Sequence, residues 1–223
     1  MLRMNQLSGF GGQSFAGVLV STGSDSNTNN PSFTVDLGPP GVKQVLCAFA
    51  CNDTAGSVVW TWGTGSVGGE AFTYVRAGNR ENSGDGGVFT GGATVRALST
   101  SLSGLQTATI SMSWGAVMNS TIMLALVVRG VNPTAIDYDG GDNQAGSGPG
   151  NDFTISTVGA RFVIGAAASS GGPGNFQGPG TEVTALASGA LSVGYDLAPT
   201  GGAADVYSFS GASKYVISGA SFG

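Results

Sequence analysis

The stretch KQVLCAFAC at residues 43–51 decides the fold, because RFVIGAAAS at residues 161–169 nearly repeats it. Both runs are apolar at almost every position, as expected of strands covered on both faces. The repeat extends outward from them. FTVDL at residues 33–37 precedes the first run and FTIST at residues 153–157 precedes the second, while STIMLALVVRG (120–130) aligns without a gap with SKYVISGASFG (213–223). The sequence therefore predicts two similar halves with the same strand order.

Other short apolar or alternating runs lie between these anchors, separated by Gly and Pro signals. They include SVVWTW (57–62), AFTYVRA (71–77) and TATISMSW (107–114). In the last, Ala108, Ile110, Met112 and Trp114 fall on one face and hydroxyl residues on the other, which is typical of a half-buried strand. Glycine interrupts most windows long enough for an amphipathic helix. The sequence predicts an all-β fold.

The chain divides into an arm and a sandwich. Residues 1–30 are predicted to form an N-terminal arm with one strand candidate, FAGVLV (15–20), and residues 31–223 a β-sandwich with half 1 at 31–131, a linker at 132–152 and half 2 at 153–223. A few short strands alone bury little apolar surface. We therefore favour a jelly-roll-like antiparallel β-sandwich whose halves share one core, with the runs 43–51 and 120–130 central and antiparallel. The alternative is two separate domains joined by residues 131–152.

Composition excludes several classes of protein. Only 9% of residues are charged, where about 25% is usual, so the surface is expected to consist of Ser, Thr, Asn and Gly. The net charge is −5 and the eight Lys and Arg are scattered; without a basic stripe, we expect no nucleic-acid binding. No run approaches the roughly 18 apolar residues of a membrane span and the start lacks an apolar signal region. We expect neither membrane insertion nor a Sec signal.

The absence of histidine limits the possible chemistry. It removes Ser-His-Asp and Cys-His nucleophiles and His-ligated zinc sites. Cys47 and Cys51 are the two cysteines, and in one strand their Cα atoms would lie about 13 Å apart, whereas a disulfide needs less than about 7 Å. We predict that both are free, buried packing residues. No catalytic residue, cofactor-binding residue or metal ligand is predicted.

Acidic residues are the remaining candidates for a site. A carboxylate pair for glycoside hydrolysis could draw on Glu70, Glu81, Glu182 or the loop aspartates, although none lies in a motif. The densest cluster, DYDGGDN, contains Asp137, Asp139, Asp142 and Asn143, whose oxygens suit Ca²⁺. An EF-hand loop that began at Asp137 would need Glu at its twelfth position, where this chain has Gly148. We interpret the cluster as a solvated loop between the halves.

The glycine-rich segments and the aromatic residues can also be interpreted either as binding sites or as structural features. GDGGVFTGG (84–92) and SSGGPGNFQGPG (169–180) lack the GK[ST] ending of a phosphate loop and are interpreted as turns or loop tips. A sugar-stacking platform could use five aromatic residues. Trp60 and Trp62 share one strand face, so a packing role is favoured for the aromatic residues. The five are Trp60, Trp62, Phe72, Tyr74 and Phe176.

The order of motifs supplies a resemblance. FTVDLGPPGVKQVLCAFACND (33–53), SVVWTWG (57–63), TATISMSWG (107–115) and STIMLALVVRGVNPTAIDYDGG (120–141), followed by a shorter repeat, resemble minor virion proteins of tailed bacteriophages, prophages and gene-transfer agents. The resemblance covers residues 33–223. It implies a role at a particle surface, as a head decoration or spike or as a tail or fibre protein, and some such proteins bind host glycans. It offers no catalytic motif to carry over.

These observations lead to a functional expectation. We expect a non-enzymatic structural protein of a phage or phage-like particle, assembled in the host cytoplasm and exposed on the virion. Its expected partners are capsid or tail subunits and further copies of itself, with the arm at residues 1–30 docking on a partner and ordering on assembly. One alternative is a glycan-binding adhesin that recognises host surface glycan. The other is a polysaccharide-degrading enzyme with paired carboxylates.

Overall fold

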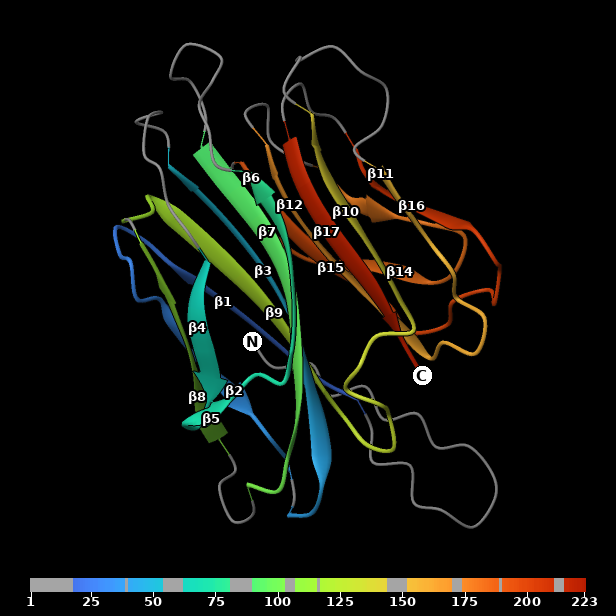
Figure 1. Ribbon diagram of the computed structural model, residues 1–223, viewed down its shortest axis with the longest axis horizontal. Coiled ribbons are helices and arrows are strands. Elements are labelled where there is room, and N and C mark those ends of the chain that lie inside the picture. Colours follow the sequence, from blue (N-terminus) through green and yellow to red (C-terminus); the bar gives the residue numbers. More distant parts are fainter. Residues whose placement is uncertain are drawn as a thin grey trace.

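The computed structural model describes ten stretches of the chain (Figure 1): residues 18–38, 40–53, 62–80, 90–102, 107–115, 117–143, 152–169, 174–188, 190–210 and 215–223. Within these stretches the chain forms strands and no helix, which confirms the all-β prediction. The same part of the chain accordingly contains no helix long and apolar enough to cross a membrane.

The first half of the chain forms two antiparallel sheets. The first inner sheet has the strand order β1-β9-β3-β7-β6, and the first outer sheet has the order β2-β8-β4-β5. The strands are β1 (Leu19–Asp25), β2 (Ser32–Asp36), β3 (Lys43–Asp53), β4 (Trp62–Val67), β5 (Glu70–Ala71), β6 (Tyr74–Arg80), β7 (Thr90–Thr100), β8 (Thr107–Trp114) and β9 (Ser120–Val128).

The second half repeats this arrangement. The second inner sheet has the order β10-β17-β12-β15-β14, and the second outer sheet has the order β11-β16-β13. The strands are β10 (Asp137–Asn143), β11 (Asp152–Ile155), β12 (Phe162–Ser169), β13 (Phe176–Gln177), β14 (Glu182–Ser188), β15 (Leu191–Asp196), β16 (Asp205–Phe209) and β17 (Tyr215–Phe222).

The sequence repeat corresponds to a structural repeat. β3 and β12, which contain the two similar runs, are the central strands of their inner sheets. β3 pairs antiparallel with β9, and β12 pairs antiparallel with β17, as predicted. β8 also alternates as predicted, with Ala108, Ile110, Met112 and Trp114 buried and Thr107 and Thr109 exposed. The finer assignment of a jelly roll stays a prediction.

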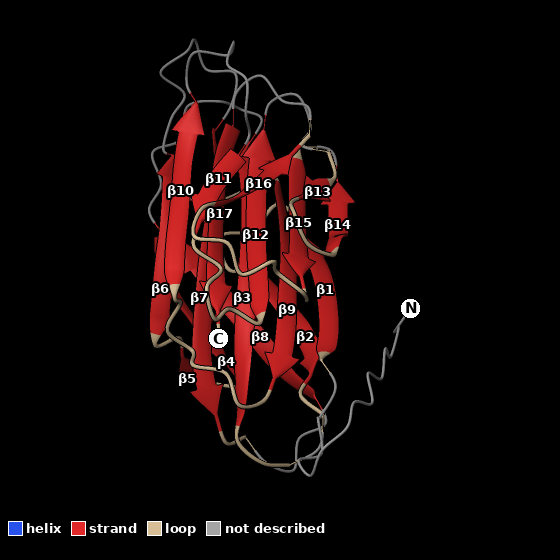
Figure 2. Ribbon diagram, turned by 90° about the vertical axis from the view of Figure 1, so that its right-hand side faces the viewer, coloured by secondary structure: helices blue, strands red, loops and turns tan. Residues whose placement is uncertain are grey.

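The four sheets stack as outer, inner, inner and outer layers, from left to right in Figure 1. Their strands run along one common direction (Figure 2). The two inner sheets face each other across a continuous apolar layer, the shared core, which includes Leu46, Leu124, Ile164 and Val193. Many alanines contribute to it from both sheets, which allows close approach of the layers. The predicted shared core is therefore present.

Each half also has a core of its own, so the structure combines both interpretations of the repeat. The first core lies between the first inner and outer sheets and contains Phe33, Phe49 and Ile110. The second lies between the second inner and outer sheets and contains Phe153, Phe176 and Phe209. Each half is thus a sandwich, and two sandwiches are joined face to face.

Two predicted boundaries differ from the structure. Within the predicted arm, residues 19–25 form β1, which overlaps the strand candidate at residues 15–20, extends beyond it and pairs along its length with β9. Part of the predicted linker, residues 137–143, forms β10 and pairs with β17. Residues 21–25 and 137–143 are mostly polar or small, so they lack the apolar alternation that marks the other strands. The second half therefore begins by residue 137, within the segment predicted as a linker.

Candidate functional site

The cysteines are packing residues. Cys47 and Cys51 are free, fully buried and part of the core of the first half, as predicted. Burial raises the pKa of both thiols far above the ordinary value; the Arg96 guanidinium acts in the opposite direction on Cys47 without offsetting it. Because the thiolate is the nucleophile and metal ligand, protonated thiols of this kind are inert.

The acidic cluster at residues 137–143 is strand β10 rather than a solvated loop, so that interpretation was wrong. The Asp137 carboxylate accepts the Ser156 backbone N–H at 2.7 Å, and the Asp139 carboxylate accepts the Thr154 N–H at 2.8 Å. These bonds join the second inner sheet to β11 in the second outer sheet and to the residue that follows β11. The side chains of Asp142 and Asn143 lie outside the described part of the structure.

The first half uses an aspartate at its corresponding corner. Asp25 on β1 accepts the backbone N–H groups of Ser26 at 2.8 Å and of Ser32, at the start of β2, at 3.3 Å. Carboxylates therefore join the first strand to the second in both halves. Within the described stretches, no group of three or more His, Cys, Asp or Glu residues is arranged to hold a metal ion.

The glutamates considered as catalytic carboxylates are not brought together. Glu70 lies on β5 in the first outer sheet, and Glu182 lies on β14 in the second inner sheet. Glu81 lies outside the described residues. The residue opposite Glu182 in the strand ladder is Asp196, which sequence reasoning did not single out.

Asp196 is fully buried and strongly hydrogen-bonded. One carboxylate oxygen accepts the backbone N–H groups of Thr181 at 3.1 Å and Ala198 at 2.8 Å, and the other accepts the Tyr207 hydroxyl at 2.8 Å. Burial, and then the bond to this carboxylate, raise the pKa of Tyr207 well above its ordinary value. A buried carboxylate with three donors is satisfied, so this network holds the end of β15 in place. No pattern in the sequence marks this pairing.

Arg96 is a second buried charged residue that the sequence does not reveal. It is 2% exposed in β7, and its guanidinium donates to the Gly63 carbonyl of β4 at 3.1 Å. Burial lowers its pKa to about 10, so it stays charged at neutral pH. The bond ties the first inner sheet to the first outer sheet.

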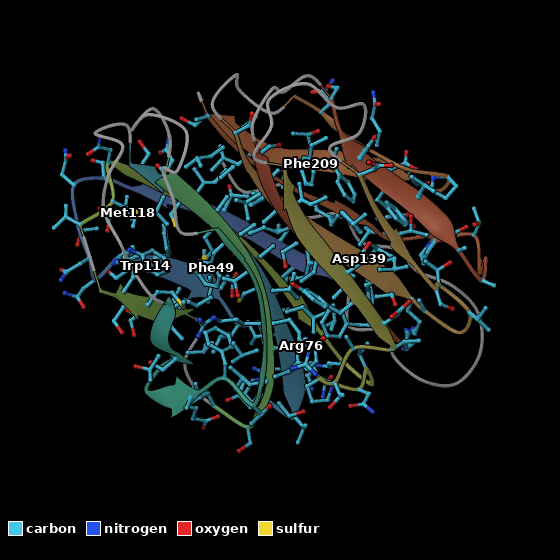
Figure 3. The ribbon with its side chains drawn as sticks, turned by 45° about the horizontal axis from the view of Figure 1, so that its top comes forward. Phe49, Arg76, Trp114, Met118, Asp139 and Phe209 are labelled. Carbon is cyan, nitrogen blue, oxygen red and sulfur yellow. The ribbon has the colours of Figure 1, made fainter. Side chains whose placement is uncertain are left out.

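The aromatic residues proposed as a sugar platform are mostly in the cores. Phe72 is buried against Phe49, with ring centroids 6.4 Å apart, and Phe176 against Phe209, at 5.2 Å. Tyr74 is buried in the shared core. The backbone of Trp62 lies in β4, whereas Trp60 falls outside the described residues. Figure 3 shows Phe49, Trp114 and Met118 in the first half and Phe209 in the second.

The glycine-rich segments are only partly turns. Gly91 and Gly92, at the end of the first segment, are buried at the start of β7, and residues 84–89 lie outside the described part. The second segment includes β13, while residues 170–173 are again not described. At Gly178 in the second segment, a Cβ would run into the Tyr207 ring. Glycine at this position therefore permits close packing against the second outer sheet.

The outer face of the first outer sheet carries several hydroxyl groups. On the first outer sheet, Ser32 pairs with Ser111 and Thr34 pairs with Thr109. On the other side of β8, the Ser111 hydroxyl lies 3.0 Å from the Ser66 hydroxyl of β4. This face is therefore mainly neutral and polar.

No family model, curated protein or solved structure matches this chain. The resemblance to minor virion proteins, which rests on the order of strand motifs, therefore stays a hypothesis.

Proposed function

We propose that this chain is a non-enzymatic structural protein of a phage or phage-like particle, displayed on the capsid or tail surface. The observation that carries the proposal is the doubled sandwich: two repeats joined through a shared core of buried aliphatic and aromatic side chains. Such a body is suited to serve as a stable building block. The resemblance of its strand motifs points in the same direction.

The use of the acidic residues supports a structural role. The Asp25, Asp137 and Asp139 carboxylates accept backbone N–H groups between sheets, and Asp196 holds a strand end. Sequence reasoning had left some of these residues open as ligands or catalysts. Their oxygens instead stabilise the fold.

Surface composition supports assembly among many copies. With 9% charged residues and a first outer sheet that carries hydroxyl groups on its outer face, repulsion between copies is low. Closely spaced subunits of a repetitive particle are then tolerated. The proposed partners are capsid or tail subunits, and the proposed location is the virion surface.

The test is incorporation into particles. Because β1 begins at Leu19, a deletion of residues 2–17 leaves every described strand intact. We expect the deleted chain to fold, with the far-UV circular dichroism and tryptophan emission of the full chain, but to be missing from purified particles. The full-length chain, carrying the same tag, should be located on the particle surface by imaging. Absence of the tagged full chain from particles would contradict the proposal.

The alternative is a glycan-binding adhesin, which would also be displayed on the particle surface. Three of its five candidate aromatics, Phe72, Tyr74 and Phe176, are buried, which disfavours a stacking platform. A glycan array with the purified chain tests it directly. Activity on host surface polysaccharide would instead favour the enzyme alternative.

A further inference from the structure

The two margins of the shared core, where the edge strands of the inner sheets lie, are built from different residues. Leu46 in β3 and Ile164 in β12 are equivalent positions of the repeat, and both face this core. From each of them, strand pairing carries a row of five residues across the inner sheet. The rows are Val20, Leu126, Leu46, Ala97 and Tyr74 in the first inner sheet and Tyr138, Ala220, Ile164, Tyr195 and Val183 in the second. Each row therefore ends in a valine at one edge and a tyrosine at the other.

Both of these tyrosines lie at the same margin, the tyrosine margin, where β6 and β10 pack against each other (Figure 2). Tyr74 is buried, and its ring lies edge-on to the Phe222 ring, with centroids 5.8 Å apart. The Arg76 guanidinium lies over the Tyr74 ring, 5.2 Å from its centroid. The Tyr138 hydroxyl accepts the Ser218 hydroxyl at 3.4 Å. Aromatic rings with polar tips thus close this margin.

Both valines lie at the opposite margin, the valine margin, beside β1 and β14 (Figure 2). Val183 is 37% exposed, although its equivalent in the first half, Tyr74, is 8% exposed. Val18, Val20 and Leu186 are only partly buried against the shared core. A valine is shorter than a tyrosine and has no polar tip, so this margin presents grouped apolar side chains to solvent. Such a group marks a surface that another segment contacts.

In the second half, the segment that leads into the edge strand covers the end of the shared core. Residues 131–136 precede β10, and the Ile136 backbone N–H donates to the Ser221 carbonyl at 2.7 Å. Val131 is 4% exposed within the shared core, and Ala135 packs against this core. The repeat therefore contains a described example of a segment that folds against the shared core just before its edge strand.

We propose that residues 13–17 of this chain cover the valine margin. Because the rows make Val20 equivalent to Tyr138, these residues precede β1 as residues 131–135 precede β10. They are joined directly to Val18, which lies in the valine margin. Their local concentration at this margin therefore exceeds that of a separate partner.

This cover is independent of the proposed function. It acts within one copy of the chain and uses a segment that supplies Phe15 as an apolar side chain. Residues 1–12 remain for contacts with other subunits. A valine margin that is open to solvent would disprove the cover without affecting incorporation into particles.

Labelling of a single introduced thiol tests the cover. Cys47 and Cys51 are buried, so an introduced cysteine reports on its own position. Val183→Cys places this thiol in the valine margin. Ala187→Cys is the matched control, because Ala187 is exposed on the same strand and, with its partner Ser192, faces away from the shared core.

In the full chain, we expect Val183→Cys to react about tenfold more slowly than Ala187→Cys, because local opening must precede reaction at a covered site. Deleting residues 2–17 should raise its rate to that of the control, whereas deleting residues 2–12 should leave it slow. Circular dichroism shows whether each variant folds. Equal rates in the full chain would overturn the inference without any deletion. So would protection that survives the deletion of residues 2–17, or protection that increases with protein concentration, which would assign the cover to a second copy.

Discussion

Replacing Tyr207 by Phe tests the buried network around Asp196. The substitution removes the hydroxyl that donates to Asp196 at 2.8 Å but keeps the ring, which stacks on Phe153 and Phe176 with centroids 5.6 and 5.5 Å away. A hydrogen bond to a charged group contributes about 1.5–3 kcal/mol. Since the carboxylate is fully buried and this oxygen loses its donor, we expect a loss of about 2–3 kcal/mol in the free energy of unfolding.

Urea unfolding followed by circular dichroism measures this loss of free energy, and thermal unfolding measures the corresponding fall in the Tm. For a chain of this size each kcal/mol lowers the Tm by about 2–4 °C, so Tyr207→Phe should lower it by roughly 4–12 °C. Tyr195→Phe is the matched control, because Tyr195 is also buried on the second inner sheet but its hydroxyl accepts and donates no hydrogen bond in the described structure. If both substitutions cost the same, the argument for the network is wrong.

The same network predicts a dependence on alkaline pH. The folded-state pKa of Tyr207 is raised above its ordinary value of 10.0, first by burial. The folded protein therefore holds this proton more tightly than the unfolded chain does, and the stabilisation is complete below pH 10 and is lost as the pH rises beyond it. Tyr207→Phe should make the alkaline fall in stability less steep. An unchanged slope would count against a buried, protonated Tyr207.

Two further predictions concern the cysteines and Asp205. Cys47 and Cys51 should react with a thiol reagent only as the protein unfolds, so the labelling rate should rise with urea; rapid labelling of the native protein would contradict their burial. The pKa of Asp205 is lowered, first by the hydrogen bond from the Thr157 hydroxyl. Its stabilisation is therefore present above about pH 3.8 and lost as the pH falls, and Thr157→Val should flatten that acid dependence when unfolding is measured between pH 2 and 6. An equally steep acid dependence in the variant would exclude this role.

The sequence predicted the features that local patterns encode. The repeat of residues 43–51 at residues 161–169 indicated two halves, and the alternation at residues 107–114 indicated which face of β8 is buried. Both depend on side-chain polarity at a fixed period. For the same reason the cysteines could be assigned to a core.

The features that were missed depend on contacts distant in sequence. β10 has the polar sequence DYDGGDN, and it is a strand because it pairs with β17. Its aspartates also accept the N–H groups of Thr154 in β11 and of Ser156 just after β11. The bond between Tyr207 and Asp196 likewise joins two sheets. Neither arrangement has a signal in a single stretch of residues.

The number of cores could not be derived from the repeat either. One shared core between two half-sandwiches would explain strand runs that are apolar on both faces. In the structure, β3 contributes one face to the shared core, through Leu46 and Ala48, and the other to the core of the first half, through Cys47 and Phe49. A doubly covered strand fits either arrangement, so only the outer sheets distinguish them.

The central claim is that the shared core joins the two sandwiches into one folding unit, and tryptophan emission tests it most directly. All three tryptophans lie in the first half, at residues 60, 62 and 114. Phe209→Ala truncates a side chain in the separate core of the second half and should cost about 3–5 kcal/mol. If the two sandwiches unfold together, this substitution in the second half also destabilises the first half. The tryptophan transition in urea should then shift by the same free energy as the circular dichroism transition. A tryptophan transition that stays in place while circular dichroism splits into two steps would contradict it.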